Sequence, residues 1–231
     1  MPTVTPSSDV ADDSVSRETP ASVEAEPQAA ATLFSDATAL DRARRFTHAL
    51  AEQGEERGLI GPLELPRLWT RHVLNSAIAA PLFPAGRVGD VGSGAGLPGI
   101  VLAIARPDVQ WVLIEPMERR VAWLSEQVEA LGLSNVEVVR ARAEEWSKGP
   151  VLDAVTARAV SALRTLLPLT APLVRNGGEL IFLKGQNAQV EIDAAAKQMR
   201  KFHVVDARVE LLGEGVLAEP TRALRGRIAR P

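Results

Sequence analysis

The 231-residue chain is 46% hydrophobic with a formal net charge of −3, which suits one folded domain with appendages. It contains no cysteine, which excludes disulfide bonds, thiolate metal sites and cysteine nucleophiles. No apolar run approaches the roughly 18 residues of a membrane span, and the N-terminus lacks the basic and apolar segments of a secretory signal, so we expect a cytoplasmic protein without membrane contact.

The first 35 residues differ in composition from the rest. They hold six acidic residues and one arginine, which leaves a net charge of about +2 on the remaining chain. They are rich in Pro, Ser, Thr, Ala and Glu and lack apolar periodicity, so we predict residues 1–35 to be a disordered acidic tail, with a partner-binding segment as the alternative. The mildly basic remainder permits nucleic acid binding without establishing it.

Residues 36–84 are predicted to form a small helical cap. Asp36 is a suitable N-cap, and apolar residues recur at helical spacing as far as Leu50. Glycines then break the pattern, and a second helix is predicted over residues 66–80, before two prolines.

From residue 85 onward, predicted strands alternate with helices. The strands cover residues 87–91, 109–114, 136–139, 152–156, 179–183, 204–211 and 223–229. The helices cover residues 97–105, 117–131, 162–174 and 188–199. This alternation predicts an α/β, Rossmann-like domain over residues 85–231, with a mostly parallel seven-stranded sheet covered on both faces. The last two strands have no helix between them and are expected to form an antiparallel hairpin at one end.

A glycine-rich loop follows the first strand of this domain. Residues 88–100 read VGDVGSGAGLPGI, a pattern that runs from Asp90 through Gly92, Gly94 and Gly96. Such glycines let the backbone turn sharply and approach a ligand, which helix N–H groups then face at the carboxyl edge of the sheet. The pattern resembles motif I of class I S-adenosylmethionine-dependent methyltransferases, in which the carboxylate would hold the cofactor's ammonium group.

A dinucleotide-binding oxidoreductase is the alternative of another enzyme class. Its Gly-x-Gly-x-x-Gly pattern fails from Gly92, because the sixth position is Leu97. From Gly94 the pattern fits only with Gly99, inside the predicted helix and too late for the turn. The chain also has no tyrosine to relay a proton.

Residues after the second and third strands complete the predicted ligand site. Glu115 can accept hydrogen bonds from ribose hydroxyls, although it would serve S-adenosylmethionine and NAD equally and could be an ordinary exposed acid. Ala143 and Glu144 stand where this fold covers an adenine ring; a solvated helix start is the alternative.

Longer stretches carry a more specific resemblance. They are residues 69–76 (WTRHVLNS), 90–100 (DVGSGAGLPGI), 115–124 (EPMERRVAWL), 155–160 (VTARAV) and 182–185 (FLKG). On these stretches the chain is similar, from about residue 39 to 229, to the ribosomal RNA small subunit methyltransferase G family, also called glucose-inhibited division protein B.

The resemblance implies methylation of N7 of one guanine in the decoding-region loop of 16S rRNA, with S-adenosylmethionine as methyl donor. By matched position, the cofactor contacts of the family fall on Gly92, Leu97, Ala143, Glu144 and Arg158. The basic residues on the substrate side would include Arg71, His72 and Lys184. The implied partner is 16S rRNA in a 30S subunit or an assembly intermediate, and a monomer is expected.

We expect no general base, because guanine N7 has an available lone pair and no proton has to be removed from it. The chain has three scattered histidines, so we expect no metal site. Arg158 could hold a phosphate, guanine O6 or the cofactor carboxylate, or form a structural ion pair. Trp69 is a candidate for base stacking. One departure is residues 58–61 (GLIG), where many members have Asn-Leu-Thr, so polar substrate contacts are not expected there.

Two other functions stay open on the residues alone. The first is a class I methyltransferase that acts on another RNA, a protein or a small molecule. The second is a non-catalytic RNA-binding or ribosome-assembly protein.

Overall fold

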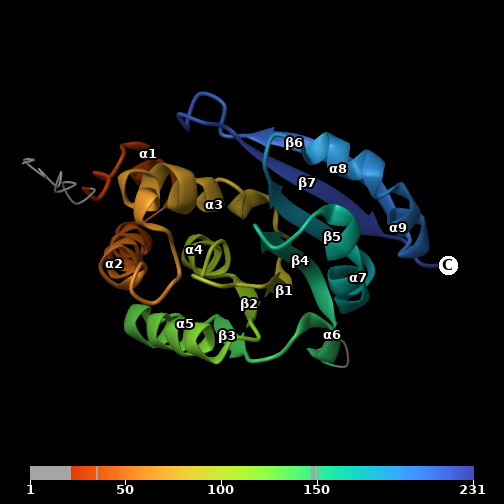
Figure 1. Cartoon of the computed structure of the whole chain (residues 1–231), viewed down its shortest axis with the longest axis horizontal. Coiled ribbons are helices and arrows are strands. Elements are labelled where there is room, and N and C mark those ends of the chain that lie inside the picture. Colours follow the sequence, from red (N-terminus) through yellow and green to blue (C-terminus); the bar gives the residue numbers. More distant parts are fainter. Residues whose placement is uncertain (1–21, 35, 147–148, 150) are drawn as a thin grey trace, which may run out of the picture.

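The computed structural model describes residues 22–34, 36–146, 149 and 151–231. Its centre is a seven-stranded sheet in the order β3-β2-β1-β4-β5-β7-β6 (Figure 1). The strands are β1 (Gly86–Val91), β2 (Val109–Ile114), β3 (Val136–Val139), β4 (Leu152–Arg158), β5 (Val174–Lys184), β6 (Val204–Leu212) and β7 (Thr221–Ile228). The pairs from β3 to β5 are parallel, whereas β7 runs antiparallel to both β5 and β6. The predicted sheet and its terminal hairpin are therefore confirmed.

Helices cover both faces of the sheet (Figure 1). They are α1 (Ala29–Leu33), α2 (Ala37–Gln53), α3 (Asn75–Ala77), α4 (Gly99–Ala105), α5 (Glu118–Leu131), α6 (Ala143–Trp146), α7 (Leu163–Thr170), α8 (Ala188–Ala194) and α9 (Ala196–Lys201). The cap, α4 and α5 enclose one apolar core with the sheet, and α6 to α9 enclose a second core on its opposite face. Among the described residues, no helix is long and apolar enough to cross a bilayer.

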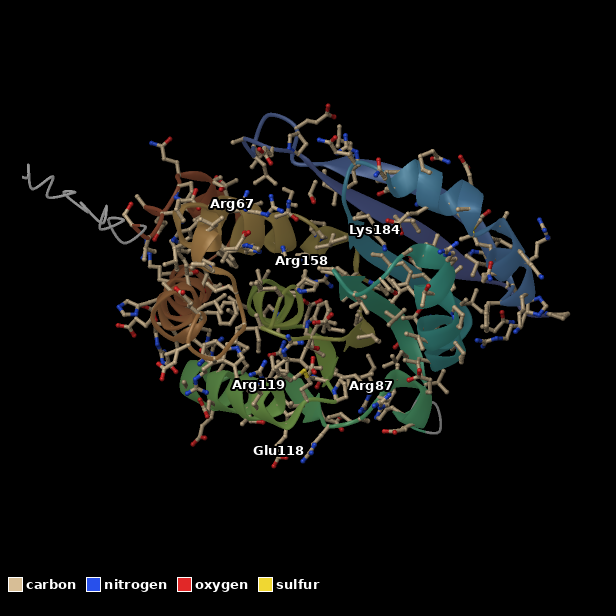
Figure 2. All side chains as sticks on the ribbon, viewed as in Figure 1. Arg67, Arg87, Glu118, Arg119, Arg158 and Lys184 are labelled. Atoms are coloured by element: carbon tan, nitrogen blue, oxygen red, sulfur yellow. The ribbon has the colours of Figure 1, made fainter. Side chains whose placement is uncertain are left out.

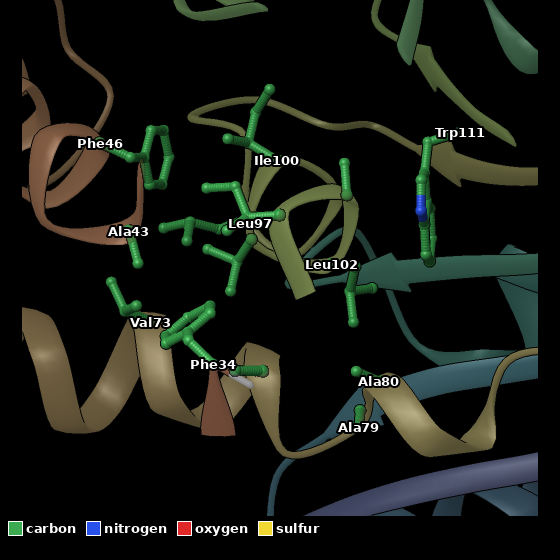
Figure 3. Packing of buried hydrophobic residues seen from close by; sticks show 14 of the residues in the cluster. Phe34, Ala43, Phe46, Val73, Ala79, Ala80, Leu97, Ile100, Leu102 and Trp111 are labelled. Carbon is green, nitrogen blue, oxygen red and sulfur yellow. The ribbon is translucent and has the colours of Figure 1, made fainter. Parts of the chain in front are cut away.

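The second cap helix was predicted wrongly as one α-helix over residues 66–80. The chain instead forms a 3-10 helix η1 (Pro62–Arg67), a π-helix η2 (Leu68–Leu74), the short α3 and a 3-10 turn (Ala80–Leu82). Helical turns begin at Pro62, four residues earlier than predicted, so Pro66 lies inside η1, where it has no N–H to donate to a preceding carbonyl. Figure 3 shows the cap residues Ala43 and Val73 packed beside Leu97 and Ile100 of the sheet domain in one shared core.

The tail prediction is wrong for residues 22–34. Ala30 and Phe34 are buried in the cap core, Phe34 with 2% of its surface exposed. The backbone N–H of Glu24 donates to the carbonyl of Leu65, and its carboxylate accepts the N–H of Thr70. One aromatic side chain and a few polar contacts thus order a segment whose composition lacks apolar periodicity. Residues 1–21 lie outside the described part.

Candidate active site

The glycine loop between β1 and α4 has the conformation that its sequence predicts. Gly92, Gly94 and Gly96 have φ angles of +74°, +54° and +92°, which side chains of L-residues rarely adopt. A Cβ on Gly94 would have no neighbour closer than 3.7 Å, so the backbone at Gly94 is open to a ligand. The loop reaches further than expected, because α4 begins at Gly99 and not at Leu97.

Asp90 is completely buried at the end of β1, where its Oδ2 accepts the N–H of Gly99 at 3.0 Å. Its Oδ1 and the hydroxyl of Thr156, its register partner on β4, have no hydrogen-bond partner among the described residues. Burial raises the pKa of Asp90 to about 7, while the hydrogen bonds and the charge of Arg158 oppose that rise. The unpaired oxygen suits a donor such as an ammonium group.

Glu115, at the end of β2, holds the glycine loop in place. Its Oε2 accepts the N–H of Gly94 and its Oε1 the N–H of Met117, each at 3.0 Å. The side chain is almost fully buried, so the alternative of an exposed acid is wrong. Each carboxylate oxygen can accept a further hydrogen bond, and this capacity suits a ribose.

The remaining predicted cofactor residues lie in different surroundings. Ala143 is buried at the start of α6, against the core on that face, and Glu144 beside it is exposed. The side chain of Leu97 points into the core shared with α2, near Phe46 (Figure 3), which leaves its backbone for a ligand.

Arg158 ends β4 on the face that Asp90 and the cap occupy. Its Nη1 donates to the carbonyl of Arg71 at 3.2 Å, and its Nη2 lies 2.7 Å from Nδ1 of His72. Burial lowers the pKa of Arg158 to about 10, against the opposing charge of Asp90. Among the described residues no carboxylate lies within 4.0 Å of the guanidinium, so the structural ion pair considered for Arg158 is absent there.

Lys184, at the end of β5, is paired rather than free. Its Nζ donates to the carbonyl of Ser161 at 2.6 Å and lies 2.9 Å from Glu191, and only 9% of the side chain is exposed. Glu191 also accepts the N–H of Leu163 at 2.7 Å. These contacts fix the loop after β4, where Ala159 has a φ of +54°.

The substrate residues expected from the sequence lie together around one cavity of about 1150 Å³. Arg71, His72 and Lys184 line it, together with Arg67 and Arg222. Arg158, which is expected among the cofactor contacts, lines it as well. Figure 2 shows Arg67 on the cap, Lys184 at the end of β5 and Arg158 between them. Val160 lines the same cavity and lies against the glycine loop, with its Cγ2 2.9 Å from where a Cβ on Gly92 would stand.

The structure also corrects the expectation for Trp69 and adds two acidic residues to the site. Trp69 is buried in the cap core and presents no face for base stacking. Glu64 and Glu191 were missed for different reasons. Glu191 meets Leu163 and Lys184 only through the tertiary fold. Glu64 meets Arg67 and His72 within eight residues, but it lies before the start of the helix that the sequence predicts. Within the part of the chain that is described, no group of three or more metal-ligating side chains occurs.

Comparisons with known proteins identify the family to which the chain belongs. A sequence model described as rRNA small subunit methyltransferase G matches residues 39–220. The Ribosomal RNA small subunit methyltransferase G of Leifsonia xyli subsp. xyli is 68% identical over 207 residues, which cover 90% of this chain and 98% of that protein. The protein of the same name from Clavibacter michiganensis subsp. michiganensis is 60% identical over 210 residues, covering 91% and 99%.

Solved structures share the fold at low identity. The N-methyltransferase NodS from Bradyrhizobium japonicum, in complex with S-adenosyl-L-homocysteine, is 15% identical with a TM-score of 0.54 and covers 78% of this chain and 99% of its own. A SAM-dependent methyltransferase from Aquifex aeolicus is 19% identical with a TM-score of 0.53, covering 75% and 98%. These structures show a class I methyltransferase fold, and the family model and close relatives go further: the chain belongs to the rRNA small subunit methyltransferase G family.

Proposed function

We propose that this protein transfers a methyl group from S-adenosylmethionine to N7 of one guanine in small-subunit ribosomal RNA. One observation carries the proposal. The segment after β4 lies against Gly92 of the glycine loop and also lines the cavity that holds Arg67, Arg71 and Arg158. A cofactor at the loop would therefore adjoin a cavity whose cations suit a phosphate backbone.

The glycine loop and its acidic neighbours suit this cofactor. Asp90 would hold the ammonium group through its unpaired Oδ1, and Glu115 would hold the ribose while it keeps Gly94 in place. Ala143 would pack on the adenine, with Glu144 toward its exocyclic amine. Bound there, S-adenosylmethionine supplies an electrophilic methyl group on a positively charged sulfur.

The protein would act mainly by alignment. Guanine N7 is nucleophilic without loss of a proton, so no side chain has to remove one. Holding reactants in line and excluding water can contribute about 7–11 kcal/mol. Arg158 remains protonated at neutral pH, and Arg71 and His72 hold two of its five N–H donors. The others could bind a phosphate, guanine O6 or the cofactor carboxylate, while N7 itself must stay free.

The cavity favours a large anionic substrate over a small molecule. Its volume of about 1150 Å³ exceeds the roughly 300–1,000 Å³ that pockets for small ligands usually have. The side chains of Arg67 and Arg71 are 44% and 52% exposed, so they can reach phosphates. We propose that a 30S subunit or an assembly intermediate provides the RNA, in the cytoplasm, and that the protein acts as a monomer.

The test is methyl transfer from labelled S-adenosylmethionine to 30S subunits that lack their native methylation. Naked 16S rRNA and the ribosomal proteins are assayed alongside. We expect label in the rRNA with wild-type protein and none with Gly94→Val, whose side chain would occupy the open face of the loop at a strained φ. Label in protein, or undiminished cofactor binding by Gly94→Val in calorimetry, would contradict the proposal.

A further inference from the structure

Glu64, His72 and Arg158 form a continuous chain of hydrogen bonds between the cap and the sheet. Nε2 of His72 lies 2.6 Å from Oε2 of Glu64, and its Nδ1 lies 2.7 Å from Nη2 of Arg158. The three residues come from η1, η2 and the end of β4. The π-helix directs the carbonyl of Arg71 and the ring of His72 toward the same guanidinium.

The donors and acceptors of this chain determine the state of the imidazole. Arginine has five N–H donors and no acceptor, so Nδ1 of His72 must accept the hydrogen bond from Arg158. The ring proton then resides on Nε2, which donates to the carboxylate of Glu64. A doubly protonated ring would direct an N–H at the guanidinium, so the geometry requires a neutral imidazole.

The surrounding charges agree with a neutral ring. Burial is the largest effect that lowers the pKa of His72, and the positive charges of Arg158 and Arg71 lower it further. Glu64 raises the pKa of His72, but its carboxylate also forms ion pairs with Arg67 at 2.7 Å and Arg71 at 3.4 Å. The ring is also shielded, with 12% of its side chain exposed.

We infer that His72 is a positioning residue: as a neutral acceptor it orients the guanidinium of Arg158, and Glu64 fixes its tautomer. In this role His72 is not the basic substrate residue that the family resemblance implies. Glu64 becomes part of the active site although it need not touch cofactor or RNA. This inference rests on the proposed function, because Arg158 is the group through which both residues would affect methyl transfer.

The tautomer can be observed directly in the full-length protein without any substrate. The chain has three histidines, so ring-nitrogen NMR spectra of uniformly ¹⁵N-labelled protein can be assigned by the loss of one set of signals in His72→Asn. We expect His72 to be neutral at pH 7 with its proton on Nε2. A proton on Nδ1, or on both nitrogens, would overturn the inference.

Three variants test the effect on activity. His72→Asn places an amide oxygen near the position of Nδ1, whereas His72→Ala removes the acceptor. His48→Asn is the matched control on the exposed side of α2, where His48 pairs with Glu52 at i,i+4. Misplacement of a substrate-positioning group can cost about 100-fold, so we expect His72→Ala to lose about that factor in kcat/KM and His72→Asn to recover to within about tenfold of wild type.

Equal losses in His72→Asn and His72→Ala, with both proteins folded by melting temperature, would overturn the positioning role. The two proposals can also fail separately. If the wild type transfers no methyl group to 30S subunits, the proposed function fails, while the ring-nitrogen spectra still decide the state of His72.

Discussion

Asp90 combines a structural and a binding role in one buried carboxyl group. Oδ2 accepts the first N–H of α4, which fixes the end of the glycine loop, and Oδ1 is left unpaired among the described residues. An uncompensated buried carboxylate is costly, so its neutral form is favoured and its pKa rises. The site thus gives up some stability to keep an acceptor ready for a cation.

The pH dependence of stability follows from this carboxyl group. Its pKa is about 7 in the folded state against 3.8 ordinarily, so the folded state binds more protons between those values. The free energy of unfolding of the ligand-free protein should therefore fall as the pH rises through this window and remain lower above about pH 7. Asp90→Asn does not titrate and keeps an acceptor for Gly99, so its melting temperature should lack this fall and should exceed that of wild type at pH 8.

Cofactor binding should change in the opposite sense. Calorimetry with S-adenosylhomocysteine should give a wild-type affinity that increases as Asp90 ionises, and Asp90→Asn should bind more weakly at pH 8. Parallel melting profiles for the two proteins between pH 4 and 8 would show that Asp90 is not the group responsible.

At the scale of the elements, the loop between β4 and α7 connects the glycine loop with the cavity that the arginines line. Lys184 holds it through the carbonyl of Ser161, and Glu191 holds both Lys184 and the N–H of Leu163. This arrangement indicates that Lys184 stabilises the loop that carries Val160 over Gly92, rather than contacting the substrate as the family resemblance implies.

Lys184→Met tests this role, because methionine keeps the apolar stem and removes the ammonium group. We expect a loss of about 1–3 kcal/mol in the free energy of unfolding and faster amide exchange in residues 161–163. The exposed Lys197 on α9 provides the control variant Lys197→Met. If Lys184→Met instead leaves the loop unchanged and lowers the salt dependence of RNA binding by about one counterion, Lys184 is a phosphate contact.

The segment before α2 is an element of the core rather than an extension of the tail. Phe34 is almost fully buried in the cap core, so Phe34→Ala should lower the free energy of unfolding by about 3–5 kcal/mol. The half-exposed Val23 provides the control, since Val23→Ala should have little effect. Denaturant unfolding measures both. A loss below about 1 kcal/mol for Phe34→Ala would contradict its place in the core.

At the scale of the whole molecule, the sheet was predictable because each strand and helix has its own local pattern. The positions of Asp90 and Glu115 at strand ends were also predictable, since parallel strands bring their carboxyl ends to one edge. The π-helix was not, because its form depends on its packing against α1, α2 and η1. The contacts of Glu191 were not predictable, because they join segments that are distant in the sequence. The contact of Glu64 with His72 spans only eight residues, but it depends on the unpredicted path of the chain from η1 into η2.

The measurement that tests the central claim most directly locates the methyl group on the RNA. Unmethylated 30S subunits are incubated with the full-length protein and labelled S-adenosylmethionine, and the rRNA is then cleaved chemically at 7-methylguanosine. We predict one new cleavage site, in the decoding-region loop, that requires both the protein and the cofactor. Labelled rRNA without such cleavage would contradict N7 as the acceptor, and the absence of label despite measurable cofactor binding would contradict small-subunit RNA as the substrate.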